Sequence, residues 1–346
     1  MTMRGNKAAL AAAMAALAFG GCAAAPSAAV NAPTAAAEPL SVFGHRSVLE
    51  FGPALLAAKN APPGTVVTAS GGVPNLWAAP DPALAASVGG HAEGAPPPPN
   101  PGMADLAGNA ETQTLRMSLK HPDVRIVVTT TEGLYRIVAR RSSGIASVAD
   151  LKGKRIAVFV NTSAAFYLHR LLKGAGLGEA DVTIVPLTAR AGADAVIKGD
   201  VDALSTWEPE AERAALALGD NGLSIQPKGA YREIYSLNAR AGTLRDPAKR
   251  KQVVAFLREL LAGCRKAEED PGEMQAMLAE RTGQNLELIR QSWHHHRFPC
   301  ALPDDLLDVM VEEEQWLAKI DGRPPRDRAT LSRLIDPSLL REARAR

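Results

Sequence analysis

The sequence predicts an α/β protein built from two units, and three features of its 346 residues lead to this prediction. Short β-prone runs alternate with helical patterns over residues 40–138 and again over 139–230, the order expected of sheets covered by helices. From residue 231 an extended run returns, and helical patterns fill most of the chain to residue 346. An apolar content of 46% and a charged content of 22% are those of an ordinary globular protein.

The first 21 residues predict an export signal. Arg4 and Lys7 precede an apolar run from Ala8 to Phe19, which suits a signal-peptide core and falls short of the ~20 residues that span a bilayer. Phe19-Gly20-Gly21-Cys22 is similar to a lipobox, in which Cys22 would carry lipid, and cleavage at an Ala-rich site within 23–37 remains the alternative. Residues 22–39 are expected to be a disordered tether. Loss of the leader removes two basic residues and leaves no net charge, so no nucleic-acid partner is expected.

The first unit is expected to alternate strands and helices as far as residue 140. Pro53 suits the first turn of a helix, and Asn109 is a plausible cap for another. Strands are expected at 40–44, 65–68, 103–107, 125–131 and 135–140, and helices at 53–58, 73–79 and 110–120. Glycines and prolines rule out a regular element over 80–102, where a cleft-rim insertion and a mobile loop remain open.

The second unit is organised around a strand that runs directly into a helix. Residues 155–160 are β-prone, and 164–173 show the apolar spacing of a helix. Thr162 and Ser163 stand between them, where hydroxyls and free amides can bind an anion, or where either residue only caps its own helix. Further strands are expected at 182–185 and 201–206, with helices over 191–198 and from Pro209 onward.

The last part combines an extended return at 231–237 with helices over 247–266, 271–282, 286–296 and 303–320. An exported protein could oxidise Cys264 and Cys300 to a disulfide, but their spacing says nothing of geometry, and two unpaired, partly buried thiols are the favoured interpretation. His294-His295-His296 lacks the i, i+4 spacing that places two ligands on one helical face, so no metal site is expected there. Glu312-Glu313-Glu314 is expected to be a solvated helix face.

Ligands of open α/β sheets bind beyond the carboxyl ends of the strands. Polar or small residues follow several of the predicted strands, and this convergence predicts a cleft between the two units. The candidate ligand-binding residues are Gly52, Asn109, Glu111, Thr131, Glu132, Thr162, Ser163, Ala164, Trp207 and Glu208.

Four stretches carry a family resemblance: 135–155 (YRIVARRSSGIASVADLKGKR), 161–164, 199–209 and 334–338. Together they resemble the nitrate/sulfonate/taurine/thiamine-precursor class of ABC transporter periplasmic substrate-binding proteins. The resemblance implies a two-lobed periplasmic-binding-protein fold of type II, with a double crossover and C-terminal helices packed on the first lobe. It also implies a periplasmic, monomeric protein without cofactor or enzymatic activity, which delivers a small anionic or zwitterionic solute to an ABC permease and its ATPase. The residues that match ligand-facing positions of the class are Thr162, Ser163, Ala164, Trp207 and Glu208.

Two of these side chains have alternative roles. Trp207 can stack on a flat ligand or pack at the base of its own helix. Glu208 can receive an ammonium group or pair with Arg140 or Arg190. An acidic cleft containing Glu111, Glu132 and Glu208 would suit a zwitterion or a heterocyclic amine better than nitrate.

Two other functions remain open. The fold also hosts a thiamine-pyrimidine synthase, although that enzyme would require a Cys-rich metal-binding run, and this sequence has three scattered cysteines. The third interpretation is a periplasmic sensor or scaffold for a signalling partner.

Overall fold

The computed structural model describes residues 38–45, 48–69, 71–79 and 102–345. The predicted signal peptide, Cys22 and nearly all of the predicted tether lie outside these residues. So does the Pro-rich segment apart from Gly102.

The first sheet has six strands in the order β11-β4-β10-β3-β1-β2. β1, β2 and β3 are parallel, while β10 lies antiparallel between β3 and β4. Its strands are β1 (Ser41–Phe43), β2 (Val66–Thr68), β3 (Leu106–Ala110), β4 (Val124–Gly133), β10 (Glu233–Arg240) and β11 (His296–Arg297).

The second sheet has five strands in the order β7-β6-β8-β5-β9. β6, β7 and β8 are parallel, and β5 is antiparallel to both of its neighbours. Its strands are β5 (Arg136–Arg140), β6 (Arg155–Val158), β7 (Thr183–Pro186), β8 (Ala203–Thr206) and β9 (Gly222–Ile225).

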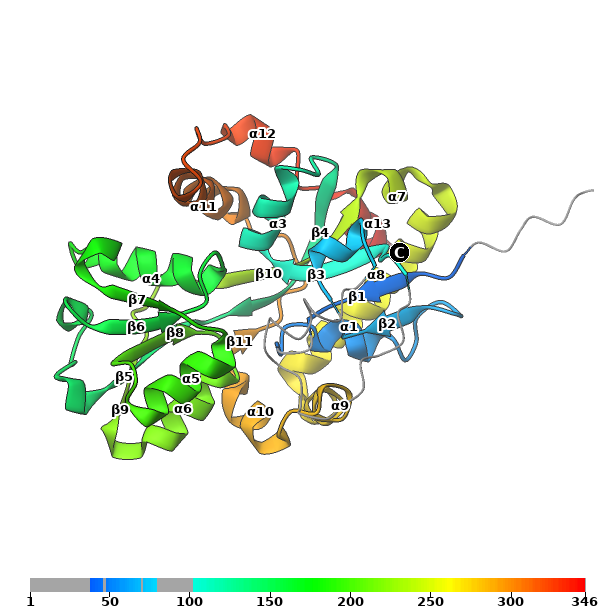
Figure 1. The fold of residues 1–346 in the computed structure, drawn as a ribbon. Coiled ribbons are helices and arrows are strands. Elements are labelled where there is room, and N and C mark those ends of the chain that lie inside the picture. The colour runs from blue at the N-terminus through cyan, green and yellow to red at the C-terminus, as the bar shows by residue number, and fades with distance from the viewer. Residues whose placement is uncertain (1–37, 46–47, 70, 80–101, 346) are drawn as a thin grey trace, which may run out of the picture. The chain divides into compact units, whose positions relative to one another are not determined.

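Helices cover both sheets, and Figure 1 shows α4 on one face of the second sheet with α5 and α6 on the other. The helices of the second lobe are α4 (Ser163–Gly174), α5 (Ala189–Lys198) and α6 (Glu210–Leu218). Those of the first lobe are α1 (Gly52–Ala57), α3 (Glu111–Ser118), α7 (Ala241–Arg245), α8 (Pro247–Glu269), α9 (Gly272–Thr282), α10 (Leu286–Ser292), α11 (Leu306–Ile320), α12 (Arg328–Ser332) and α13 (Ser338–Arg344). Short 3₁₀ turns are η1 (Val73–Leu76), η2 (Arg141–Ser143), η3 (Ala149–Leu151), η4 (Glu179–Asp181), η5 (Gly219–Asn221) and η6 (Trp293–His295).

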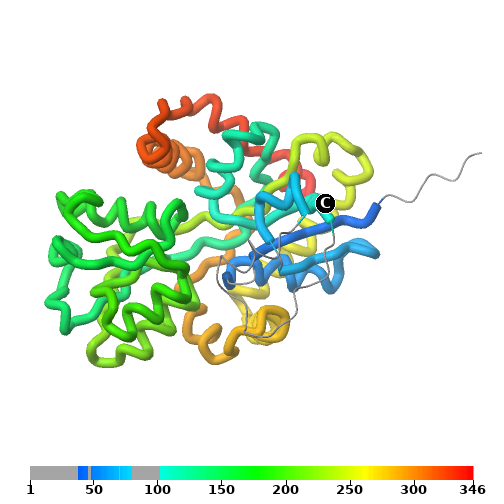
Figure 2. The backbone as a smooth tube through the Cα atoms, in the orientation of Figure 1, coloured from blue at the N-terminus to red at the C-terminus, as the bar shows by residue number. Residues whose placement is uncertain are grey.

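The chain crosses between the sheets twice, as the tube in Figure 2 shows. It leaves the first sheet through Leu134 and Tyr135, between β4 and β5, and returns over residues 226–232, between β9 and β10. The later helices then pack on first-lobe elements: α8 on α1, α13 on α8 and β4, and α11 on α3. The predicted fold class is therefore confirmed: two α/β lobes, a double crossover, and C-terminal helices on the first lobe.

Three strands differ from the prediction, and one of them, β11, lies where the helix over 286–296 was expected to end. β3 begins at Leu106 instead of residue 103, because the ladder with β1 starts where Leu106 pairs with Val42, and Met103 is exposed. β9 was missed. Its sequence, Gly-Leu-Ser-Ile, is short and only partly buried, so it lacks the apolar run expected of an inner strand.

The expectation of two free thiols is wrong, because Cys264 and Cys300 form a disulfide with a Cα–Cα distance of 6.0 Å. Cys264 lies on the buried face of α8, and Cys300 follows β11. Packing of α8 beneath the first sheet brings together two residues that are 36 positions apart.

The expectation of a solvated helix face over Glu312–Glu314 is wrong, and part of the histidine run is buried too. Glu313 and Glu314 are inaccessible to solvent, because α11 turns them towards the protein and Arg323 and Arg326 form ion pairs with Glu314. His295 and His296 are buried as well, since the helix ends at residue 292 and the chain continues into η6 and β11.

Candidate functional site

The carboxyl ends of both sheets meet at the first crossover. β1, β3 and β4 point the same way, and β4 ends at Gly133. In the second sheet β6 and β8 are parallel, and Arg136, the first residue of β5, pairs with Thr206, the last residue of β8. Tyr135 therefore joins the two edges at which α/β proteins bind ligands.

Four glutamates gather at this junction, and we call them the carboxyl cluster: Glu50, Glu111, Glu233 and Glu313. They come from the loop before α1, the start of α3, the start of β10 and the middle of α11. Each is at most 4% exposed. Buried carboxyl groups at this density are uncommon unless a partner neutralises them or protons remain bound.

Hydrogen bonds connect one half of the carboxyl cluster. The Tyr231 hydroxyl donates to Glu111 at 2.5 Å and lies 3.2 Å from Glu313 Oε1. The backbone N–H of Ile234 donates to the second Glu111 oxygen. Burial raises the pKa of Glu111 to about 7, although these donors oppose the shift. Burial, and then the charge of Glu111, raise the pKa of Glu313 well above its ordinary range.

The other half lies beside a buried histidine. His296 Nε2 is 3.4 Å from Glu50 Oε1. Burial alone would raise the pKa of Glu50, but the close approach and charge of His296 lower it overall. For His296 the same contact outweighs burial and raises the pKa. Burial, and then the charges of Glu50 and Glu111, raise the pKa of Glu233 well above its ordinary range.

Gly133 allows the carboxyl groups of Glu50 and Glu233 to approach the end of β4. A Cβ at this position would lie 3.0 Å from Glu233 Oε2, 3.2 Å from Glu50 Oε1 and 3.3 Å from the Tyr135 ring. These distances are tighter than ordinary van der Waals contact. The absence of a side chain at residue 133 is therefore part of the local geometry.

Aromatic rings surround the same junction, and we call them the aromatic group: Tyr135, Phe166, Tyr167, Trp207 and Tyr231. The ring of Tyr135 lies 5.9 Å from that of Tyr231 and 6.4 Å from that of Trp207. The Tyr135 hydroxyl shares a 2.9 Å hydrogen bond with Ser163 Oγ at the start of α4. Trp207 is 7% exposed, and its indole N–H has no hydrogen-bond partner among the described residues.

Arg136 anchors a separate ion network beside the aromatic group. Its guanidinium donates to Glu208 at 2.9 Å and also binds Glu212, while Glu208 Oε2 accepts from the backbone N–H of Glu212. The partner of Glu208 is thus Arg136 and not Arg140 or Arg190, the two arginines considered from the sequence.

Ligand atoms of Glu208, Glu212 and His295 lie within 4.8 Å of one another, close enough to share a metal ion. Burial, and then the nearby Arg136, lower the pKa of His295 to about 3, so its imidazole is neutral, the form that binds metal. However, Arg136 already supplies the positive charge between the two carboxylates, and the group is therefore an ion network.

The remaining predicted residues make local contacts. Thr131 Oγ1 donates to the Glu50 carbonyl, Glu132 pairs with Arg232 at 2.7 Å, and Asn109 accepts from the Ala110 N–H. Thr162 Oγ1 donates to the Phe159 carbonyl and so does not cap α4, while the Ala164 carbonyl accepts from Ser205. Gly52 packs against Met274 and Leu278 of α9. Of the predicted set, the structure brings Glu111, Ser163 and Trp207 together.

Sequence reasoning missed eight residues at the junction: Glu50, Tyr135, Phe166, Tyr167, Tyr231, Glu233, His296 and Glu313. A signal existed for Glu313, which is spaced three or four residues from apolar Val309, Met310, Trp316 and Leu317 on α11. Tyr231 and Glu233 were assigned to the return crossover but not to the site.

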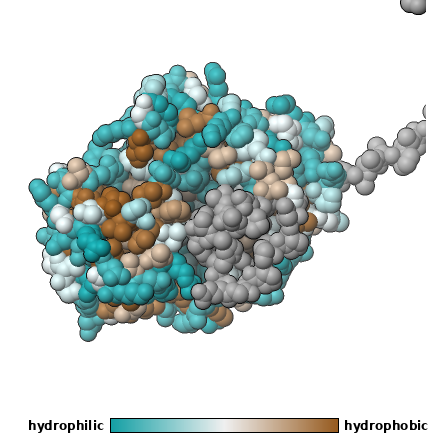
Figure 3. Space-filling view, in the orientation of Figure 1, coloured by the Kyte–Doolittle hydropathy of each residue, from teal (hydrophilic) through white to brown (hydrophobic). Residues whose placement is uncertain are grey.

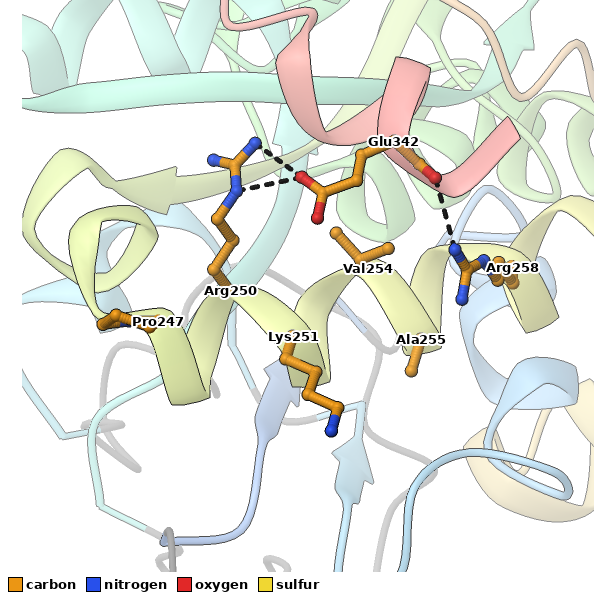
Figure 4. Close-up of a pocket in the computed structure, with 7 residues that line it drawn as sticks. All are labelled: Pro247, Arg250, Lys251, Val254, Ala255, Arg258 and Glu342. Atoms are coloured by element: carbon orange, nitrogen blue, oxygen red, sulfur yellow. Dashed lines mark hydrogen bonds and ion pairs between the residues drawn. The ribbon is translucent and has the colours of Figure 1, made fainter. Parts of the chain in front are cut away.

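The surface offers two other features. Figure 3 shows apolar surface over the second lobe on the viewed face. Among the described residues of that lobe, Val160, just after β6, is 38% exposed. A pocket lies between α8 and α13 (Figure 4), and it is lined by Pro247, Arg250, Lys251, Val254, Ala255, Arg258 and Glu342. Arg250 and Arg258 both bind Glu342 across it. This pocket is lined by residues of two helices, and no strand end contributes to it.

The sequence is similar to two putative aliphatic sulfonates-binding proteins. The Escherichia coli (strain K12) protein is 29% identical over 183 residues, which are 52% of this chain and 55% of that protein. The Bacillus subtilis (strain 168) protein is 38% identical over 100 residues, 29% of each. The chain thus spans about half the length of the first relative and less of the second.

Solved structures share the fold. The alkanesulfonate-binding protein SsuA from Xanthomonas axonopodis pv. citri bound to MOPS superposes with a TM-score of 0.64 at 22% identity, covering 87% of this chain and 100% of that one. The periplasmic nitrate-binding protein NrtA from Synechocystis PCC 6803 has a TM-score of 0.63 at 13% identity, covering 88% of each. The desulfurization enzyme DSZB has a TM-score of 0.55 at 16% identity, covering 88% of this chain and 98% of that one.

The family described as "NMT1/THI5 like" matches residues 93–274, which are more than half of the sequence and include both crossovers. The fold of the solved relatives and the strand-end junction agree with this match. The chain belongs to the NMT1/THI5-like family.

Proposed function

We propose that this protein is the exported solute-binding component of an ABC importer. It binds a small solute where the two lobes meet and delivers it unchanged to a membrane permease driven by an ATPase. The fold and the names of the relatives support this proposal, since SsuA and NrtA are described as binding proteins.

The main support for this proposal is the set of unpaired buried polar groups at the first crossover. Buried polar groups from both lobes converge on the first crossover, and several have no hydrogen-bond partner among the described residues, including oxygens of Glu50, Glu233 and Glu313 and the N–H of Trp207. Leaving such groups unpaired costs roughly 1–3 kcal/mol each. A bound solute would supply the missing partners, and opening of the lobes would admit it.

The disulfide supports export. Disulfides persist in oxidising compartments such as the periplasm, and Cys264–Cys300 joins α8 to the segment after β11. Within the described part of the chain, no helix combines the length and apolar character needed to cross a membrane. From the disulfide and the names of the periplasmic relatives, we propose a monomeric periplasmic protein that contacts the membrane through its permease or through lipid on Cys22.

An enzyme is the second candidate because DSZB shares the fold. A nucleophilic thiol would favour this candidate, but both cysteines in the described residues are bonded to each other. The junction instead provides hydrogen-bonding groups and rings, which suit reversible capture. A periplasmic sensor that reports ligand status to a signalling partner would use the same binding step.

Equilibrium dialysis of the purified protein against a mixed pool of sulfonates, nitrate, amino acids, amines and thiamine precursors tests capture. We expect one compound to be enriched at about one per protein and to be recovered chemically unchanged. Conversion of the compound to a product would support the enzyme instead. Enrichment of no compound would contradict solute capture.

A further inference from the structure

We infer that the solute carries a positive charge, which the carboxyl cluster and the aromatic group bind together. This inference rests on the proposed function and specifies the chemistry of the same site. It begins with the imbalance of charge at the junction.

Acidic groups outnumber cations around the carboxyl cluster. The titratable groups that face it are Glu50, Glu111, Glu233, Glu313, Tyr135, Tyr231 and His296. Only His296 among them can become positive, and it lies against Glu50. Arg136 is engaged by Glu208 and Glu212. Three carboxyl groups therefore have no side-chain cation of their own in the described residues.

Unpartnered polar atoms point to a missing ligand. Glu50 Oε2, Glu233 Oε2 and Glu313 Oε2 accept no hydrogen bond from the described residues. In the other lobe the buried indole N–H of Trp207 has no partner among the described residues, and its ring lies against Tyr135. This N–H is a donor, so it would bind an acceptor atom elsewhere on the solute and not the cationic group itself. An ammonium or amidinium group supplies several N–H donors, which carboxyl oxygens accept.

The rings strengthen the preference for a cation. Tyr135, Tyr231 and Trp207 present π systems next to the carboxyl cluster, and the faces of such rings attract positive charge. A buried sulfonate or nitrate would instead lie near Glu50, which remains ionised beside His296. Like charges in a low-dielectric site repel strongly.

Burial raises the pKa of Glu111, Glu233 and Glu313. Without a solute, protons bound to these carboxyl groups therefore neutralise the charge that a cation would otherwise balance. A cationic solute should displace at least one of them. The dissociation constant should then fall roughly tenfold per pH unit between pH 5.5 and pH 7, for each proton released. An anion held by protonated carboxyl groups would show the opposite trend.

Three probes with one ring separate these possibilities: benzylamine, benzyl alcohol and benzenesulfonate. Isothermal titration of the full-length purified protein in phosphate and in Tris, at several pH values, gives the affinity and the number of protons exchanged. We expect benzylamine to bind most tightly and to release about one proton. Tighter binding of benzenesulfonate, proton uptake, or binding of none of the three would overturn the inference. The unbiased dialysis experiment would still decide whether the protein captures a solute.

Two variants test whether benzylamine binding and proton release depend on the carboxyl cluster. Glu313→Gln should weaken benzylamine binding at pH 7.5 at least tenfold and reduce proton release. Glu280→Gln, an exposed change on α9, is the matched control and should leave both unchanged. Equal benzylamine affinity in Glu313→Gln and the control would contradict the inference, and the proton count on the unmodified protein provides a test even if Glu313→Gln folds poorly.

Discussion

Replacement of Glu111 by Gln should change how the free energy of unfolding depends on pH. Glu111 is fully buried, and burial raises its pKa from 4.5 to about 7. Between these values the unfolded chain has lost the Glu111 proton and the folded chain retains it. The contribution of Glu111 to stability is therefore fully present below about pH 4.5 and is lost as pH rises through 7.

The size of the effect follows from the shift. A change of one pKa unit corresponds to about 1.4 kcal/mol, so a shift from 4.5 to about 7 gives about 3 kcal/mol. Gln is neutral like the protonated acid and does not titrate; its amide oxygen can accept from the Ile234 N–H, while its amide nitrogen, facing Tyr231, can only donate to that hydroxyl. The unfolding free energy of wild type minus that of Glu111→Gln should thus fall by about 3 kcal/mol between pH 4 and pH 8.

Equilibrium urea unfolding, followed by tryptophan fluorescence at half-unit pH steps, measures this difference. The lowered pKa of His295 makes stability rise between about pH 3 and 6.5, in the opposite direction. This contribution is common to both proteins and cancels when the unfolding free energy of Glu111→Gln is subtracted from that of wild type. The Glu280→Gln variant controls for loss of a carboxylate at an exposed position. A difference that is flat, or that grows with pH, would refute the assignment of Glu111 as a carboxyl group that burial keeps protonated.

Three further changes test the surroundings of the site, each by urea unfolding at pH 7.5. Arg136→Ala should cost about 3–5 kcal/mol, because it leaves the buried Glu208 unpaired, and a loss below 1 kcal/mol would contradict a buried ion pair. Replacing Cys264 and Cys300 together by Ala should cost about 4 kcal/mol, from the loop that the disulfide closes, and reductant should then have no effect on the variant. Gly133→Ala should cost about 1–3 kcal/mol through crowding of the carboxyl groups, and an unchanged stability would show that the end of β4 has room for a methyl group.

Much of the fold follows from local patterns in the sequence. Residues 156–158 are apolar because β6 lies between two neighbours in the second sheet, and 163–174 show the spacing of a helix with one buried face. The first residue of β3 was placed wrongly. Met103 and Ala104 are apolar like much of β3, and only pairing with β1 determines that the strand begins at Leu106.

Long-range contacts account for what the sequence did not reveal. The disulfide depends on how α8 lies beneath the first sheet, which spacing between cysteines does not encode. The choice of Arg136 as partner of Glu208 depends on the pairing of β5 with β8, which places the two side chains at adjacent strand ends. Such partners become visible only when the topology is known.

Glu313 shows how the site and the fold depend on the same pattern. The apolar spacing of α11 puts this residue on the buried face, where a hydrophobic residue would stabilise the helix more simply. A carboxyl group there contributes to stability mainly while it is protonated, because burial and Glu111 raise its pKa. This buried acid lowers the stability of the solute-free protein as pH rises, and it lies in the carboxyl cluster beside the aromatic group. Its presence is therefore better explained by a bound ligand than by packing.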